Sequence, residues 1–77
     1  MRITDKDIER VVEQINSIAY PSGEGSLVQL DWAYGGVKAE YMNGMDIAST
    51  GYVAKRLCYF VLVAFKQGLL AGKGELR

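Results

Sequence analysis

The fold of this chain is decided by residues 27–42, which read LVQLDWAYGGVKAEYM. Apolar and polar residues alternate on either side of Gly35 and Gly36, as they do in a strand with one buried face. Glycine readily adopts the positive φ angles that a two-residue hairpin turn requires. The stretch therefore predicts an antiparallel hairpin over about residues 27–42, with Gly35-Gly36 as its turn.

This turn also predicts which residues face one another across the hairpin. It pairs Tyr34 with Val37, and every apolar pair that follows then lies on one face. It sets Asp31 opposite Glu40, a like-charge pair that costs some stability. Lys38 lies diagonal to Asp31 and is expected to offset part of that cost.

Before the hairpin, the sequence predicts a helix over about residues 4–19. Thr4 is a good N-cap residue, and Asp7 follows three positions later, as in a capping box. Apolar residues then recur at helical spacing and form one stripe: Ile8, Val11, Val12, Ile15 and Ile18. The opposite side, which includes Asn16, is polar, so one side of this helix is expected to pack against the sheet.

The chain after the hairpin is expected to hold a second helix. Residues 45–48 are a possible short third strand, the helix spans about residues 51–70, and residues 72–77 form a frayed tail. The apolar face of this helix covers about 200° of its surface, where a surface helix needs about 100°. Such a face predicts either a central helix or contact with another chain. The predicted contact residues are Leu62 and Leu69, with Val63 and Leu70 as secondary candidates.

Together, these elements predict a single α+β domain spanning residues 1–77, which is a small domain with a marginal core. Its expected order is α-β-β-(β)-α in two layers. The sheet is either an antiparallel hairpin or three-stranded, and both helices lie on one of its faces.

The composition argues against several kinds of site. The chain has no histidine and one cysteine, Cys58, so neither histidine-based catalysis nor an intrachain disulfide is expected. Cys58 lies on the apolar side of the second helix and is expected to be buried. Nine basic residues balance nine acidic ones, whereas a dedicated nucleic-acid binder is usually basic. We therefore expect no enzyme activity, no metal, no cofactor and no nucleic-acid partner.

Neither a leader nor a membrane span is predicted. The first ten residues are polar and alternate in charge. The longest strongly apolar run is residues 57–65, whereas a helix needs about 20 such residues to cross a bilayer. An unpaired cysteine fits a reducing compartment. The expected location is the cytoplasm, without membrane contact.

Two short segments are candidate binding sites. At the hairpin tip, Tyr34, Gly35 and Gly36 place exposed backbone where a partner can approach closely. Near the start of the second helix, Lys55 and Arg56 offer adjacent cations. Because Tyr34 also belongs to the apolar strand face, its side chain is a candidate for the core as well.

The order of several short motifs resembles that of small uncharacterised phage and prophage proteins. The motifs are residues 3–16, Ala33 to Gly36, Ser49 to Gly51, Lys55-Arg56 with Tyr59, and Ala64-Phe65 with Gly68-Leu69. Leu57 departs from the pattern, because an acidic residue is usual there. The resemblance implies a phage accessory protein in the host cytoplasm with no established chemistry. Counter-defence inhibitors, including anti-CRISPR proteins, are common among phage proteins of this size.

The leading hypothesis is a non-enzymatic phage-type accessory protein that binds a host protein and inhibits or modulates it. A homodimer formed through the second helix is also expected. One alternative is an oligomeric protein that sequesters a nucleotide-like ligand with the residue pairs Gly35-Gly36 and Lys55-Arg56. Another alternative is a nucleic-acid-binding regulator.

Overall fold

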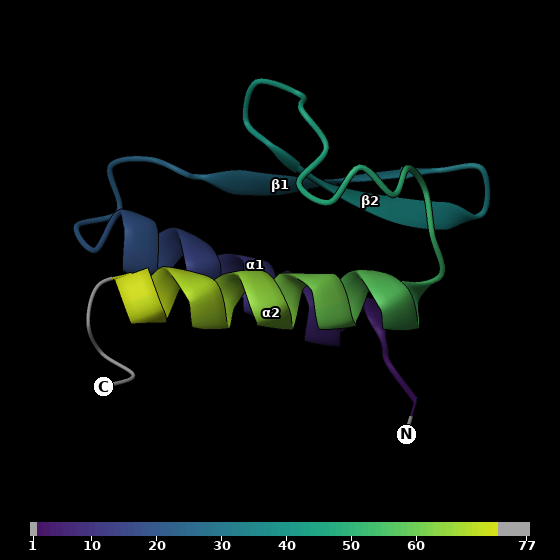
Figure 1. Ribbon diagram of the computed structural model, residues 1–77, viewed down its shortest axis with the longest axis horizontal. Helices are drawn as coiled ribbons and strands as arrows, with labels where there is room; N and C mark the ends of the chain where they lie inside the picture. The colour runs from purple at the N-terminus through teal and green to yellow at the C-terminus, as the bar shows by residue number, and fades with distance from the viewer. Residues whose placement is uncertain (1, 73–77) are drawn as a thin grey trace.

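The computed structural model describes residues 2–72, which form two helices and two strands in the order α-β-β-α. The elements are α1 (Asp5–Ala19), β1 (Val28–Ala33), β2 (Gly36–Tyr41) and α2 (Lys55–Gly72). The strands pair as an antiparallel sheet, and both helices lie under the same face of it (Figure 1). The predicted α+β class is therefore confirmed.

Helix α1 begins where its sequence predicts. The Thr4 hydroxyl accepts a hydrogen bond from the Asp7 N–H, and the Asp7 carboxylate accepts one from the Thr4 N–H at 2.8 Å. This reciprocal pair is a capping box, which satisfies backbone donors that the helix itself leaves free. The hydrogen bond from the Thr4 backbone lowers the pKa of Asp7 below its ordinary value.

The hairpin turn lies one residue earlier than the sequence indicated. It consists of Tyr34 and Gly35, whose φ angles are 54° and 73°, and Ala33 pairs with Gly36 across it. Positive φ at both positions matches the right-handed twist of the flanking strands. The sequence correctly predicted a two-residue turn, but Gly35-Gly36 was the wrong pair.

The earlier turn shifts the register, so the expected pair of Asp31 with Glu40 does not form. Asp31 instead lies opposite Lys38, and Glu40 lies opposite Gln29. The observed register thus replaces a like-charge pair with an opposite-charge pair, which stabilises the sheet. The shift leaves the paired residues of both strands on their expected faces, because side chains alternate with a period of two, whereas Tyr34 moves from the strand face into the turn.

Gly36 has a packing role outside the turn. A Cβ atom at this position would lie 2.7 Å from the carbonyl oxygen of Val53, which is closer than real Cβ atoms approach. Val53 is held there by two backbone hydrogen bonds with Val37, at 2.9 and 3.0 Å. Only glycine therefore permits the chain after β2 to lie this close to the strand.

The segment that joins β2 to α2 covers the outer edge of β2. Besides the contacts of Val53, the Tyr41 N–H donates to the Met45 carbonyl at 2.8 Å, and the Ile47 N–H donates to the Ala39 carbonyl at 3.1 Å. Between its contacts with β2, the segment forms loops that lie away from the strand (Figure 1).

The possible third strand over residues 45–48 is present only as an isolated bridge between Glu40 and Asp46. The Asp46 carboxylate accepts hydrogen bonds from the backbone N–H groups of Ala48 at 3.1 Å and Gly51 at 2.7 Å. An aspartate side chain that accepts hydrogen bonds from backbone N–H groups a few residues later in the chain favours a tight loop over an extended strand. These bonds explain why pairing stops after one residue.

The core lies between the sheet and the two helices. Helix α1 packs under β1, α2 packs under β2, and the helices contact each other. Eight hydrophobic residues are buried: Ile8, Val11, Ile15, Val28, Val37, Ala39, Cys58 and Leu62. The expectation that Cys58 is buried is therefore confirmed.

Helix α2 begins at Lys55, later than expected, because Val53 is held against β2, and it continues to Gly72. The predicted tail therefore begins too early, since Gly72 is helical. The rest of that tail, residues 73–77, lies outside the described residues.

Helix α2 turns the side that carries Cys58 and Leu62 toward the core. Leu62 is fully buried, and Val63 and Leu69 pack partly buried against the core. Leu70 is also half-buried. Leu62 is buried within its own chain and therefore has no surface for a partner in this structure, whereas the contact predicted for Val63, Leu69 and Leu70 stays a prediction. The sheet and α1 select one half of the wide apolar surface, and helical periodicity could not indicate which half.

Candidate functional site

The structure brings the two predicted binding segments to one end of the molecule. The hairpin turn lies at the same end as the start of α2 (Figure 1). The rings of Tyr34 and Tyr52 meet edge to face, with their centroids 5.0 Å apart. Lys55 follows in the chain shortly after the contact of Val53 with Gly36. We call the residues Tyr34, Gly35 and Tyr52 the tip surface.

Tyr34 dominates the tip surface. Its side chain is 91% exposed, so it is not a core residue. Its φ of 54° lies in the left-handed region, which residues other than glycine seldom adopt. Contact with Tyr52 limits the positions of the ring, and a well-positioned exposed tyrosine is typical of protein-binding hot spots.

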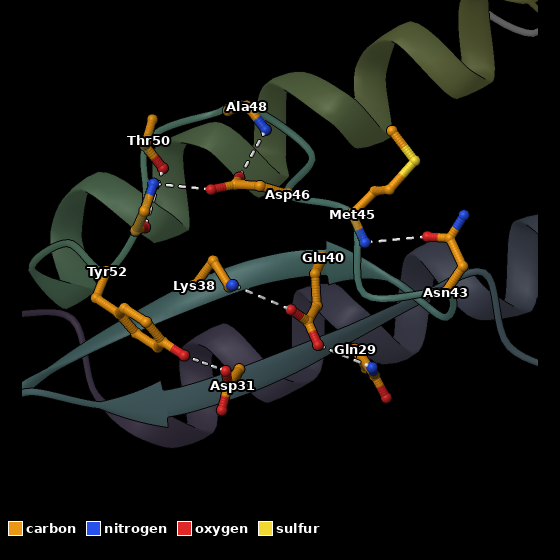
Figure 2. Close-up of polar contacts among 11 residues, drawn as sticks. Gln29, Asp31, Lys38, Glu40, Asn43, Met45, Asp46, Ala48, Thr50 and Tyr52 are labelled. Atoms are coloured by element: carbon orange, nitrogen blue, oxygen red, sulfur yellow. Dashed lines mark hydrogen bonds and ion pairs between the residues drawn. The ribbon is translucent and has the colours of Figure 1, made fainter.

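A polar network on the outer face of the sheet supports the tip surface (Figure 2). The Tyr52 hydroxyl donates a hydrogen bond to the Asp31 carboxylate. The Lys38 ammonium lies 3.4 Å from the Glu40 carboxylate and 5.0 Å from the centroid of the Tyr52 ring. Gln29 Nε2 donates to Glu40 Oε1 at 2.9 Å. Both carboxylates have partners within the chain, so the network ties Tyr52 to β1 and joins β1 to β2.

Two ionisable groups have pKa values raised above their ordinary values. The hydrogen bond from Tyr52 to Asp31 raises the pKa of Tyr52 to about 12. Burial raises the pKa of the Cys58 thiol to about 11. Both groups are therefore protonated at neutral pH, and Cys58 lacks the thiolate character of a nucleophilic cysteine.

The two cations at the start of α2 contact different groups. The Lys55 ammonium lies 2.7 Å from the Asp5 carboxylate, at the beginning of α1. The Arg56 guanidinium lies 5.9 Å from the centroid of the Phe60 ring. Lys55 and Arg56 therefore do not converge on one point, as a phosphate ligand would require.

Beside Arg56, α2 exposes part of its wide apolar surface. Leu57 and Phe60 are each 49% exposed and lie about one helical turn apart. The same face continues with the half-buried Val61 and the exposed Ala64. We call these four residues the α2 stripe. Large apolar side chains next to an arginine are typical of protein-contact surfaces.

Shallow grooves lie along both sides of α1. One lies between α1 and the C-terminal half of α2 and has a volume of about 420 Å³, with Lys66 and Leu70 among its lining residues. Another lies between α1 and β1, with the same volume of about 420 Å³, and we call it the β1 groove. The sequence did not indicate the β1 groove, because strand alternation places Trp32 on the helix-facing side of the sheet but does not show that it stays 41% exposed.

In residues 2–72, no group of three or more Cys, Asp or Glu side chains is arranged to hold a metal ion. Neither helix in that range is long and apolar enough to span a bilayer.

Comparisons with known proteins found no matching family model, curated protein or solved structure. The resemblance to small phage and prophage proteins remains a prediction. Function is inferred from the tip surface and the α2 stripe themselves.

Proposed function

We propose that this chain is a non-enzymatic protein-binding module that inhibits or modulates a partner by occupying part of the partner's surface. The observation that carries the proposal is the α2 stripe, where Leu57 and Phe60 remain half in water. If the phage resemblance holds, the partner is a host protein and the role is counter-defence. The proposal itself requires only a protein with an apolar surface.

The energetics favour a protein partner. Covering apolar surface contributes roughly 25 cal/mol per Å², and Leu57 and Phe60 are the largest side chains of the α2 stripe. Arg56 lies against Phe60 and is positioned to bond polar groups at the rim of an interface. Tyrosine and arginine are enriched at binding hot spots. Tyr34, at the same end of the molecule, adds a second exposed anchor.

A second copy of the chain is one partner that would fit this surface. Two α2 stripes packed antiparallel about their centre would set Leu57 of each copy beside Ala64 of the other, and Phe60 beside Val61. Such packing would cover the exposed apolar side chains of both copies. A homodimer is therefore part of the proposal, formed through Leu57 and Phe60 and not through Leu62.

The two other functions receive less support. A nucleotide-like ligand needs converging cations, whereas Lys55 and Arg56 contact different groups. A nucleic-acid regulator needs a basic surface, whereas the chain carries no net charge.

Affinity capture with matched variants tests the proposal. The tagged chain is used as bait in a cell lysate, alongside a Leu57→Lys/Phe60→Lys variant and a Ser17→Lys/Gln67→Lys control. Both pairs add two lysines at exposed helical positions, so both variants are expected to melt near the wild type. We expect the control to retain the same protein as the wild type and the stripe variant to lose it.

Light scattering separates the two kinds of partner. If the wild type is a dimer and the stripe variant a monomer, the partner is a second copy. The proposal is wrong if the stripe variant and the control retain the same proteins and have the same mass in solution.

A further inference from the structure

The two edges of the sheet differ in what covers them. The outer edge of β2 is covered by the segment over residues 45–53, which bonds to Val37, Ala39 and Tyr41. In an antiparallel pair, backbone groups alternate between the partner strand and the outside. The other residues of β2 therefore bond to β1, which directs the N–H and C=O groups of Val28, Leu30 and Trp32 outward.

Only part of this outward row in β1 is satisfied within the chain. The Asn16 side chain accepts a hydrogen bond from the Val28 N–H at 3.0 Å and donates one to the Val28 carbonyl at 3.2 Å. In the described part of the chain, no hydrogen bond reaches the outward groups of Leu30 or Trp32. β1 also lacks the lysine, proline or bulge that usually protects an exposed edge.

The β1 groove runs beside these open backbone groups. Val12, Leu30 and Trp32 supply its apolar lining. Trp32 is 41% exposed although it lies on the helix-facing side of the sheet. An apolar channel next to unpaired strand groups is the geometry at which an extended peptide adds to a sheet.

The charge of the groove limits what can occupy it. Glu9 and Glu13 lie about one helical turn apart on α1, are exposed, and both line the groove. No ion pair within residues 2–72 involves either one. An occupant with lysine or arginine side chains would complement them. A second copy would instead bring the same two glutamates, and pairing centred on Asp31 would set that carboxylate against its own copy.

We propose that the β1 groove binds an extended basic segment of another protein, which adds to β1 as a third strand. The backbone of the segment pairs with Leu30 and Trp32. Its apolar side chains pack on Trp32, and its cations reach Glu9 and Glu13. This surface belongs to α1 and β1 (Figure 1), whereas the α2 stripe belongs to α2, so the proposal stands independently of the proposed function.

The synthetic heptapeptide Lys-Thr-Val-Thr-Lys-Thr-Val, with blocked ends, carries lysine and valine on the same face of a strand and tests the proposal directly. Trp32 is the only tryptophan, so its fluorescence reports on the groove alone. We expect the peptide to shift the Trp32 emission to shorter wavelength and to slow hydrogen exchange at the amides of Leu30 and Trp32. The same peptide with glutamate in place of lysine is expected to do neither.

Matched variants separate charge from strand pairing. We expect Glu13→Lys to weaken the binding of the lysine peptide about fivefold or more and to remove most of the salt dependence of that binding. Glu24→Lys, a reversal of another exposed glutamate, should leave binding unchanged. Two further lysine peptides are methylated at alternate backbone nitrogens, one at the N–H groups that face β1 and the other at those that face away. Only the first should lose binding.

Three results would overturn the proposal. The first is an unchanged Trp32 spectrum at millimolar lysine peptide. The second is equal binding of the glutamate peptide or of both methylated peptides. The third is slow exchange at Leu30 and Trp32 in the protein alone that disappears on dilution, because a second copy would then occupy the edge.

Discussion

The side chain of Asn16 acts as a strand partner for Val28. Its Nδ2 donates to the Val28 carbonyl at 3.2 Å, and its Oδ1 accepts from the N–H groups of Val28 at 3.0 Å and Leu27 at 2.8 Å. These bonds join the end of α1 to the start of β1. They also satisfy the outward backbone groups of Val28, so the open edge of β1 is limited to Leu30 and Trp32. Asn16 therefore contributes both to the fold and to the shape of the β1 groove.

Asn16→Ala is expected to destabilise the protein by about 1–3 kcal/mol, because it leaves partly buried backbone groups of Leu27 and Val28 without partners. Urea denaturation measures the change in the free energy of unfolding. Ser17→Ala, at the adjacent exposed position, is the control and should change stability by less than about 0.5 kcal/mol. Equal effects of the two substitutions would contradict the role given to Asn16.

Two glycine-to-alanine substitutions are expected to change stability in opposite directions. Gly36→Ala should lower the free energy of unfolding by about 1–3 kcal/mol, because the new methyl group meets the Val53 carbonyl. Gly68 lies at an exposed position of α2 with open space around it. Gly68→Ala should therefore raise that free energy by about 0.5–1 kcal/mol. Thermal and urea denaturation of both variants check the signs. A neutral Gly36→Ala would mean that the chain after β2 does not lie against this strand.

The bond between Tyr52 and Asp31 predicts an unusual alkaline titration. With its pKa raised from the ordinary 10.0 to about 12, Tyr52 binds its proton more tightly in the folded state. Its contribution to stability is therefore complete below pH 10 and is lost as pH rises from about 10 to 12. Tyrosine absorbance followed against pH should show a late phase, which Tyr52→Phe removes and Asp31→Asn moves to lower pH. A late phase that survives Tyr52→Phe would refute the assignment.

Cys58 is expected to react slowly with thiol reagents in the native protein. Burial raises its pKa from the ordinary 9.0 to about 11, which lowers the thiolate fraction at pH 8 about a hundredfold. Limited access to the buried sulfur slows the reaction further. A chromogenic disulfide reagent should therefore react much faster in urea than in buffer. Comparable rates in both would show that α2 opens readily.

Charge reversal at the start of α2 is expected to leave the fold intact. Lys55→Glu/Arg56→Glu loses the ion pair with Asp5, whose partners are 50% and 57% exposed, so the loss is at most about 1 kcal/mol. Glutamate at a helix N-terminus recovers about 0.3–1 kcal/mol through the helix dipole. Circular dichroism should give a melting temperature near the wild type. Lys55→Gln/Arg56→Gln lacks the dipole gain but also lacks the repulsion that a glutamate at position 55 meets at Asp5, so it should melt close to the charge-reversed variant. A melting temperature far below the wild type for either variant would contradict this prediction.

Local signals in the sequence were enough to predict the elements and their order. The capping box of Thr4 and Asp7 forms within one helical turn, so α1 begins where the sequence places it. The alternating strands likewise predicted a hairpin with the correct inner face. Such features depend on near neighbours in the chain, and the same chemistry acts whatever the rest of the fold does.

The hairpin register depended in part on a contact that is distant in sequence. Tyr34-Gly35 and Gly35-Gly36 are adjacent candidates for a two-residue turn, and local preference favours the second. The observed turn leaves Gly36 free to meet Val53 and places Asp31 opposite Lys38. The Asp31–Lys38 pair lies within the hairpin, whereas the contact of Gly36 with Val53 forms only when the chain after β2 folds back. The sequence of the hairpin alone therefore did not reveal every contact that favours this register.

The candidate site divides in the same way. The sequence by itself determined that the hairpin tip and the start of α2 carry Tyr34, Lys55 and Arg56. Only the tertiary structure decided that Lys55 pairs with Asp5 and that Leu57 and Phe60 stay exposed. Because α2 is apolar around most of its circumference, several orientations would bury similar area. The positions of α1 and the sheet selected one orientation, and with it the surface that remains open to a partner.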